Sequence, residues 1–502
     1  MPNRGRRLPL DVTLSAPAPV TRAHVGLRSE RGPILGAVML SVALVAIDTT
    51  ILATAVPAIV EDLGGFTQFP WLFSTYLLAQ AVTTPIYGKL ADVFGRKPLM
   101  LFGITLFVLG SVLCALSWSM TALIVFRAVQ GLGAGAIQPA AVTIMGDIYS
   151  VAERAVAQSY VAGVWAVAAV VGPTLGGLLS EHTSWRWIFW INVPLGVLAA
   201  VVLVRRFEET AAHEARAERR SIDVVGALLL AGAALLLLLG LLEGGIRWPW
   251  WSPAGVGIFV ASAVLLLAFV AVERRVPDPV LPLWVFGNRV LNAATIGAFV
   301  VGMLMLGVTS YVPVYAQRVL GAGAVVAGLA VAALAIGWPI AASTAGRFYL
   351  RWGYRPCLLA GAAFGLVGTG IVASVGPGSP VWLLALGCLV LGLGLGYVAS
   401  PSIIAAQSAV GWRDRGVATG TNMFARSVGS AVGVAVFGAV ANGVVASRLG
   451  GGQRAGEVDL DALPISILDP ALHTVFVVVA CTSVALVVAG LVMPSRVSSV
   501  TE

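Results

Sequence analysis

One carboxylate, Asp48, lies near the middle of an apolar run, Ile34 to Val60, that is long enough to cross a lipid bilayer. A charge at that depth costs at least about 2.5–3.5 kcal/mol on insertion scales, so it usually faces a protein interior or a water-filled cavity. The chemistry open to such a carboxylate is the binding and release of a proton. The alternative is an aspartate that a neighbouring helix neutralises for packing alone.

A cation, Arg127, lies inside another apolar run, 121–146. It is as costly there as an acid, and Asp48 is the only acid well inside the first six apolar runs. A rise of about 1.5 Å per residue places Arg127 roughly 10 Å, and Asp48 roughly 18 Å, from the outer ends of their helices. Because a long arginine side chain covers much of that difference, we expect a direct ion pair or a shared water network.

Other kinds of chemistry have little support in the sequence. The four cysteines stand singly in apolar runs, and the four histidines lie in tails or between the runs. No zinc-protease, phosphate-loop or nucleophile-elbow motif occurs in a suitable context. We therefore expect no enzyme, no metal site and no cofactor.

The amino-acid composition indicates the class of protein in which these charged residues occur. Of the 502 residues, 58% are hydrophobic and 11% charged, and the mean hydropathy is +0.93. No water-soluble domain hides so much apolar surface. The net charge of +8 could suggest nucleic acid, but the basic residues form short clusters between apolar runs, as membrane topology requires.

Fourteen apolar runs of about twenty residues or more predict an all-α integral membrane protein with fourteen transmembrane helices. They are 34–60, 70–88, 99–118, 121–146, 157–180, 187–204, 222–242, 254–272, 290–317, 322–345, 356–375, 380–404, 416–444 and 471–493. The expected domains are a tail (1–33), a six-helix bundle (34–204), a connector (205–221), two additional helices (222–272), a linker (273–289), a second six-helix bundle (290–493) and a tail (494–502).

The basic residues predict the orientation in the membrane. The tails and alternate loops on one side hold 24 of the 31 arginines and lysines, and the opposite side holds five. The remaining two, Arg127 and Arg426, lie within helices. Since cytoplasmic loops carry an excess of basic residues, both termini, the connector and the linker are expected in the cytoplasm.

A short sequence recurs in the two bundles. Gly88 to Pro98 reads GKLADVFGRKP and Gly346 to Pro356 reads GRFYLRWGYRP, with glycine, cation, glycine, cation and proline at the same spacing. Both segments link the second and third helices of a six-helix half, so they indicate a duplication. The second copy has Leu350 where the first has Asp92.

GKLADVFGRKP resembles the signature loop of the major facilitator superfamily. Four further segments resemble motifs of its fourteen-helix drug:proton antiporters: IDTTILATAVP around Asp48, FRAVQGLGAGAIQPA around Arg127 and Gln130, GVWAVAAVVGPTLGG from Gly163 to Gly177, and WRWIFWINVPLG from Trp185 to Gly196. Many relatives have an asparagine where Ala53 stands here. The resemblance covers residues 34–493.

The resemblance implies two bundles that rock about a central cavity and a multidrug efflux antiporter of the cytoplasmic inner membrane, with a role in antibiotic resistance. Asp48 and Arg127 would couple export of a small amphipathic substrate to proton entry. The alternative is a dedicated exporter or flippase of an envelope lipid or secreted metabolite. A membrane scaffold or receptor would need a soluble sensory domain, and the sequence has none. We expect a monomer in contact with membrane lipids and no nucleic-acid partner.

Two groups of residues are gating candidates. In the loop, Asp92 with Arg96 and Lys97 can make charge contacts with neighbouring helix ends, while Gly88 and Gly95 permit tight turns. A static topology anchor is the alternative. In the fifth helix, small residues allow close approach of a helix from the opposite half and a proline permits a bend, or they form a plain packing seam: Gly172, Pro173, Gly176 and Gly177.

The sequence does not identify the substrate. Aromatic, polar and flexible side chains could line an adaptable cavity, although helical spacing suits each equally well to the core or to lipid. These candidates are Gln130, Trp165, Met303, Tyr311, Tyr315 and Phe424.

Overall fold

The computed structural model describes residues 25–64, 68, 71–207, 223–244, 248–448 and 464–495. Most of the 1–33 tail, of the 205–221 connector and of the 494–502 tail lies outside this part of the chain, as do the side chains of Ala53 and Pro173.

The first bundle follows the six expected spans. It consists of α2 (Gly32–Leu63), α3 (Trp71–Phe94), α4 (Arg96–Ala115), α5 (Met120–Ile148), α6 (Val151–His182), and the short α7 (Trp187–Trp190), which continues into α8 (Asn192–Arg206). The additional helices are α10 (Val224–Glu243) and α11 (Pro253–Glu273).

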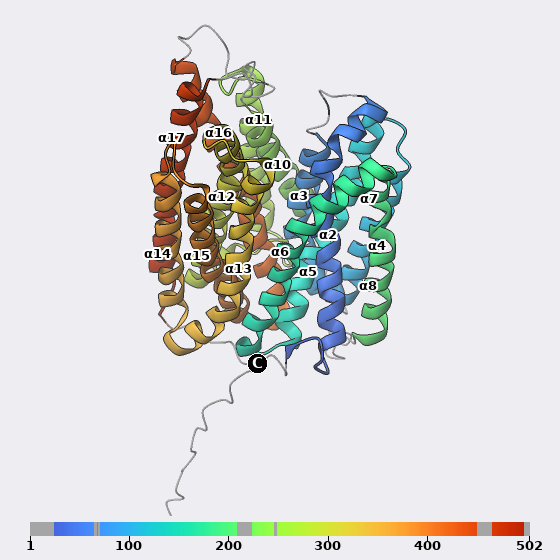
Figure 1. Cartoon of the computed structure of the whole chain (residues 1–502). Helices are drawn as coiled ribbons and strands as arrows, with labels where there is room; N and C mark the ends of the chain where they lie inside the picture. The colour runs from blue at the N-terminus through green and yellow to red at the C-terminus, as the bar shows by residue number, and fades with distance from the viewer. Residues whose placement is uncertain are drawn as a thin grey trace, which may run out of the picture.

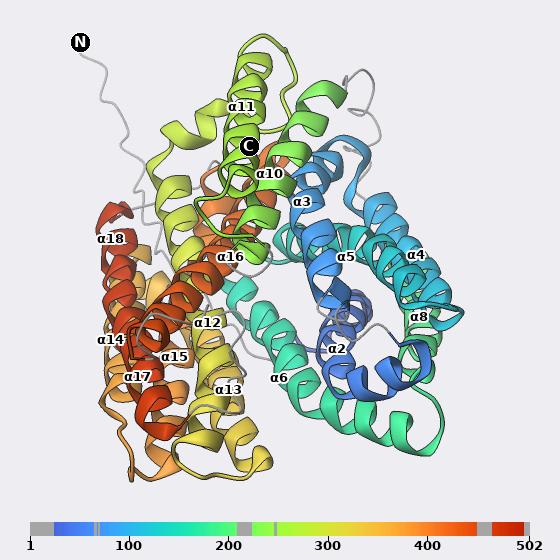
Figure 2. The same cartoon turned by 90° about the horizontal axis from the view of Figure 1, so that it is seen from above.

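The second bundle has the same number of crossings. It consists of α12 (Arg289–Arg318), α13 (Ala324–Trp352), α14 (Tyr354–Ser374), α15 (Val381–Ser408), α16 (Arg415–Arg448), and α17 (Ile465–Ser483), which continues into α18 (Ala485–Val492). Short 3-10 turns, η2 (Leu283–Gly287) and η3 (Trp412–Asp414), precede α12 and α16. Figure 1 shows the two bundles side by side, and Figure 2 shows α16 between α12 and the first bundle.

Polar residues begin several of these helices because they satisfy the first free N–H groups. The Ser119 side chain accepts from the backbone of α5, and Asp223 and Ser252 do the same for α10 and α11. Ser150 and Glu153 form a reciprocal capping box at the start of α6.

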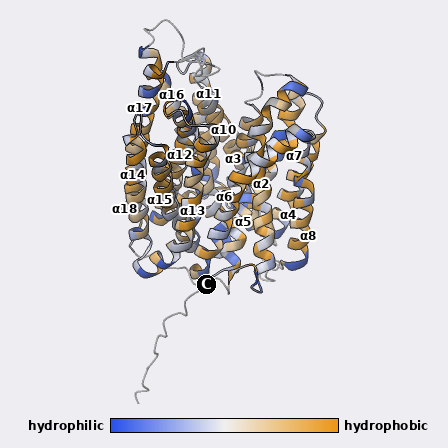
Figure 3. Ribbon diagram, viewed as in Figure 1, coloured by the Kyte–Doolittle hydropathy of each residue, from blue (hydrophilic) through white to orange (hydrophobic). Residues whose placement is uncertain are grey.

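Thirteen of the described helices or joined helix pairs are long and apolar enough to cross a membrane. The helix α3 is not among them because it carries polar residues such as Gln80, Thr83 and Thr84, yet it stands within the first bundle beside α5. Figure 3 shows apolar residues along the helices and hydrophilic ones concentrated at their ends. The expectation of an all-α integral membrane protein with about fourteen crossings is confirmed.

The two bundles meet at one end of the molecule. We call this the basic end; it carries the junctions at 94–96, 148–151, 352–354 and 412–415. There α3 packs against α16 and α6 packs against α13. Away from this end, α3 and α16 also share an apolar cluster with the additional helix α10, which includes Leu78 of α3, Leu238 of α10 and Ala431 of α16.

The repeated segments are more helical than expected of a loop. The helix α3 continues to Phe94 and α13 to Trp352. Each is therefore separated from the next helix by a single residue, Gly95 or Gly353. Both glycines have positive φ, 101° and 91°, a conformation that side chains strongly disfavour. The same backbone break therefore recurs at equivalent places in the two bundles.

Candidate functional site

Asp48 and Arg127 form a buried ion pair inside the first bundle. The Arg127 Nη1 donates to Asp48 Oδ2 at 2.6 Å, and each residue is 1% exposed. The guanidinium also donates from Nε to the Leu72 carbonyl at 3.2 Å and lies 4.2 Å from the centre of the Tyr76 ring. Because α3 supplies both of these groups, the pair is held by three helices, α2, α3 and α5.

Gln130 bridges the two charges. Its Nε2 donates to Asp48 Oδ1 at 2.8 Å, and its Oε1 accepts from Arg127 Nη1 at 2.6 Å. The three-residue spacing on α5 puts Arg127 and Gln130 on one helix face, which explains why both reach the same carboxylate. Gln130 is fully buried, so it belongs to this network and not to an open cavity.

Two further residues, Asn192 and Ser111, belong to the network and were not identified from the sequence. Asn192 Nδ2 donates to Asp48 Oδ1 at 3.4 Å and to the Ser111 hydroxyl at 3.2 Å, and Gln130 Nε2 donates to the same hydroxyl at 2.7 Å. Asn192 stands in the WRWIFWINVPLG segment, whose asparagine in an apolar context was the available signal.

The same segment fixes the position of Asn192 through its first residues. Arg186 donates to Asp62 at 2.6 Å and to the Ser117 carbonyl at 3.1 Å, and the Trp185 indole donates to Asp62 at 3.0 Å. The Arg186 hydrogen bond, with that of Trp185, lowers the pKa of Asp62. These contacts tie the end of α2 and the end of α4 to the start of α7, so α8 begins beside Asp48.

A second cluster joins the bundles at the basic end. Arg96 donates from Nη2 to Asp92 at 2.9 Å and to the Trp412 carbonyl at 2.8 Å, and its Nε lies 3.0 Å from Asp147. Asp147 also pairs with Arg415 of the second bundle at 3.1 Å. The Arg96 side chain is fully buried, with its guanidinium 3.9 Å from the Trp412 ring centre.

Asp92 makes two hydrogen bonds with the second bundle. Its two carboxylate oxygens accept from the backbone N–H groups of Gly416 and Val417, each at 2.9 Å. These groups begin α16, where the helix dipole favours an anion. Gly88 lies on the same face one turn earlier, and a Cβ built on it would come 2.4 Å from the Gly416 carbonyl oxygen.

The other loop candidates have local partners. The Lys97 amino group donates to the Val204 carbonyl of α8 at 3.1 Å, within the first bundle. Gly95 supplies the positive-φ break between α3 and α4. Of the loop residues, the structure thus brings Gly88, Asp92 and Arg96 to the contact between bundles.

The glycines of α6 face a different neighbour from the one expected. A Cβ built on Gly172 would meet the Thr50 hydroxyl at 2.0 Å, and one on Gly176 would meet the Ile51 carbonyl oxygen at 2.5 Å. Both therefore pack against α2 of the same bundle instead of the opposite half. The contact of α6 with the second bundle lies nearer the basic end, where Ala155 approaches Gly346.

This geometry predicts that the same substitution has different effects at two adjacent glycines. We expect Gly176→Ala to lower the thermal stability of the detergent-solubilised protein and its transport rate, because the added methyl would overlap the α2 backbone. Gly177→Ala should change neither, since a Cβ there meets nothing within 4 Å. Equal behaviour of the two variants in thermal unfolding would contradict the packing described here.

Most of the cavity candidates lie in apolar packing. Tyr315 is fully buried and donates to Asp469 at 2.8 Å, and Met303 is buried against Gly433. Trp165, Tyr311 and Phe424 are partly buried beside apolar clusters.

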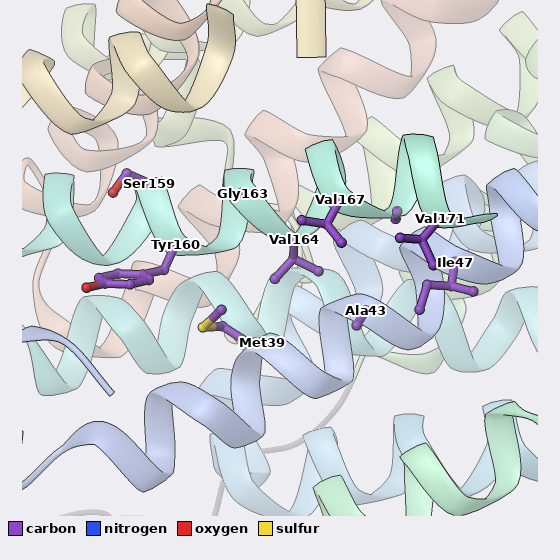
Figure 4. Close-up of a pocket in the computed structure, with 10 residues that line it drawn as sticks. Met39, Ala43, Ile47, Ser159, Tyr160, Gly163, Val164, Val167 and Val171 are labelled. Atoms are coloured by element: carbon purple, nitrogen blue, oxygen red, sulfur yellow. The ribbon is translucent and has the colours of Figure 1, made fainter. Parts of the chain in front are cut away.

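An apolar groove with a volume of about 470 Å³ runs between α2 and α6. Figure 4 shows Met39, Ala43 and Ile47 of α2 opposite residues of α6 between Ser159 and Val171. Its only side-chain hydroxyls are those of Ser159 and Tyr160. The groove passes Ile47, next to Asp48 in the chain, but the carboxylate itself is closed off in the buried network.

Comparisons with known proteins identify the family of the chain. The family model of the Major Facilitator Superfamily matches residues 38–434. The chain is 35% identical over 412 residues to Multidrug resistance protein 3 of Bacillus subtilis (strain 168), covering 82% of this chain and 80% of that protein. It is 30% identical over 417 residues to Multidrug transporter protein MdtP of the same organism, covering 83% and 76%.

A solved structure shares the fold. The crystal structure of the human organic anion transporter MFSD10 (TETRAN) matches with a TM-score of 0.62 at 15% identity, covering 90% of this chain and 99% of that one. With a family match over most of its length, relatives named as multidrug resistance and multidrug transporter proteins, and two helical bundles of membrane-spanning length, the chain belongs to the major facilitator superfamily of multi-pass membrane transporters.

Proposed function

We propose that this transporter exports amphipathic small molecules, drugs among them, in exchange for protons. The observation that carries the proposal is the buried network of Asp48, Arg127 and Gln130, which places one titratable carboxylate deep in a bundle. The names of the two Bacillus subtilis relatives support drugs as the class of cargo.

The network suggests how a proton acts on the first bundle. In the described conformation, Arg127 and two amides donate to Asp48. A proton on Asp48 removes the charge that compensates Arg127. The guanidinium then needs new partners, so α2 and α5 repack and the conformational equilibrium of the two bundles shifts.

The contacts at the basic end suggest which conformation is described. The cluster of Asp92, Arg96, Asp147 and Arg415 closes that end, and the positive-inside rule favours its placement in the cytoplasm. The protein would then be closed to the cytoplasm, with both termini on that side of the cytoplasmic membrane, and would act as a monomer surrounded by lipid.

A second candidate function is a dedicated exporter or flippase of an envelope lipid or secreted metabolite. The groove between α2 and α6 favours it, because an alkyl chain would fit a surface built from valines, alanines and Met39. The first candidate is better supported by the relatives' names, and transport of a lipid analogue in preference to any drug would reverse this order.

Transport by the purified protein in liposomes tests the proposal. With one proton site, exchange of one proton for one neutral molecule moves one positive charge, so the membrane potential contributes about 2.3 kcal/mol per 100 mV in addition to the pH gradient. We expect export of a neutral dye to be driven uphill by either gradient alone. Transport indifferent to both gradients would contradict proton coupling.

A further inference from the structure

A second arginine lies deep within a membrane-spanning helix, in the other bundle. Arg426 belongs to α16, which has 34 residues and begins at Arg415. A rise of about 1.5 Å per residue places it roughly 17 Å from the start of that helix. Its side chain is partly buried. A cation at such a depth normally has a counter-ion, as Arg127 has in Asp48.

Arg426 has no counter-ion within the described residues. No hydrogen bond or ion pair of its side chain occurs there, and no charged group lies close enough to interact with it. Among the described residues from α12 to α18, the acids are Asp414 in η3, just before α16, and Asp469, which accepts a hydrogen bond from Tyr315 near the start of α17. The first bundle therefore compensates its buried cation internally, whereas the second does not.

The neighbours of Arg426 show where its face of α16 is directed. Asn422 and Ser430, one turn to either side, donate to backbone carbonyls of α12. Met423, three residues earlier, belongs to an apolar cluster that includes Ala140 of α5. Residues three and four apart share a helix face, so Arg426 lies on the side of α16 between α12 and the first bundle. Figure 2 shows α16 in this central position.

We propose that Arg426 binds the monoanionic group of an amphipathic molecule in the space between the bundles. The cargo or a lipid would then supply the counter-ion that Asp48 supplies to Arg127. A guanidinium suits this task because its planar set of donors matches a carboxylate or a phosphate diester. The inference rests on the proposed export function, since it assigns a specificity-determining residue to that transport.

The proposal has an electrical consequence. Exchange of one proton for a neutral molecule moves one positive charge inward, whereas exchange for a monoanion moves the equivalent of two. For each transport cycle, the membrane potential should therefore contribute twice as much free energy to the export of an anionic cargo as to that of a neutral cargo of the same shape. This ratio can be read from the steady-state concentration gradients of a matched pair of compounds.

Binding to the purified full-length protein tests the site without any proton gradient. The probes are an amphipathic aryl carboxylate dye and its methyl ester, measured at neutral pH in nanodiscs of phosphatidylcholine. We expect Arg426→Gln to raise the Kd of the carboxylate by about tenfold or more, the loss expected for a charge-assisted hydrogen bond, and to leave the Kd of the ester unchanged. Arg426→Lys should keep part of the preference for the carboxylate.

Arg448→Gln is the matched control because it removes an exposed arginine from the far end of the same helix. It should change the binding of neither probe. Equal weakening of the carboxylate and the ester by Arg426→Gln would mean a structural role and overturn the proposal, as would an unchanged carboxylate Kd. If Arg426→Gln does not fold, the wild type decides the question: added salt should weaken carboxylate binding much more than ester binding.

Nanodiscs that also contain phosphatidylglycerol identify the source of the anion. Competition of this lipid with the carboxylate in the wild type, lost in Arg426→Gln, assigns the site to a headgroup phosphate. Carboxylate binding that is unaffected by the lipid assigns it to a dissolved anion. Because these assays need no gradient, failure of proton coupling in Asp48 variants would leave their result intact, and the two claims can fail separately.

Discussion

Replacing Asp48 with asparagine should abolish uphill transport while leaving the protein folded and inserted. Asparagine keeps the shape of the side chain and can still accept a hydrogen bond from Arg127, but it binds no proton at physiological pH. The variant should therefore still exchange labelled for unlabelled substrate down a concentration gradient. The measurement is uptake into liposomes with and without an imposed pH gradient, after size-exclusion chromatography has shown a single species.

Glu61→Gln is the matched control for this prediction. It removes another carboxylate of α2, one that is exposed at the helix end. Transport by this control should remain driven by the pH gradient. Breaking a buried ion pair from one side costs about 3–5 kcal/mol, so the Asp48→Asn, Arg127→Gln double variant, which carries no uncompensated charge, serves if the single variant is unstable. Persistent uphill transport by either variant would exclude Asp48 as the coupling site.

Adding one methyl group at Gly416 should prevent the bundles from closing at the basic end. A Cβ there would lie 2.1 Å from the Gly88 carbonyl oxygen and 2.7 Å from both carboxylate oxygens of Asp92. Overpacking costs about 1–3 kcal/mol, which shifts a conformational equilibrium by roughly 5- to 150-fold. We expect Gly416→Ala to lose most of its transport activity. Spin labels on α3 and α16 near this end should report a longer distance than in the wild type.

Gly370→Ala provides the comparison because a Cβ at that position of α14 meets nothing within 4 Å. This control should transport at the wild-type rate and keep the wild-type spin-label distance. An active Gly416→Ala protein with an unchanged distance would mean that the close approach of α3 and α16 is not required in the transport cycle.

The sequence alone predicts a contact between residues that would be energetically costly to leave without a partner. Asp48 and Arg127 are each too costly to stand unpaired in an apolar run, and the structure joins them at 2.6 Å. The apolar runs likewise predicted the helices, because burial in a bilayer leaves few alternatives for the backbone. Ends of helices were less predictable: the charges of GKLADVF suggested a loop, but these residues form the last turns of α3.

The rest of the site depends on tertiary contacts that no short segment contains. An asparagine in an apolar context, such as Asn192, indicates that a polar partner exists but does not identify that partner, which here lies 144 residues away. Arg415 resembles any other arginine between two apolar runs until the fold places it beside Asp147. The small residues of α6 indicated close packing but not the neighbour, and the structure identifies it as α2.

The two charged clusters are attached to the same helix. Near its start, α3 offers the Leu72 carbonyl and the Tyr76 ring to Arg127, and near its end it holds Gly88 and Asp92 against α16. At about 1.5 Å per residue, the distance along the helix from Leu72 to Asp92 is roughly 30 Å, so a tilt of about 5° about one end displaces the other by roughly 2.6 Å. A displacement of that size exceeds what the hydrogen bonds of Asp92 to α16 can follow. Rigid tilting of α3 would thus release the basic end whenever Arg127 moves, without any chain of rearranging side chains between the two places.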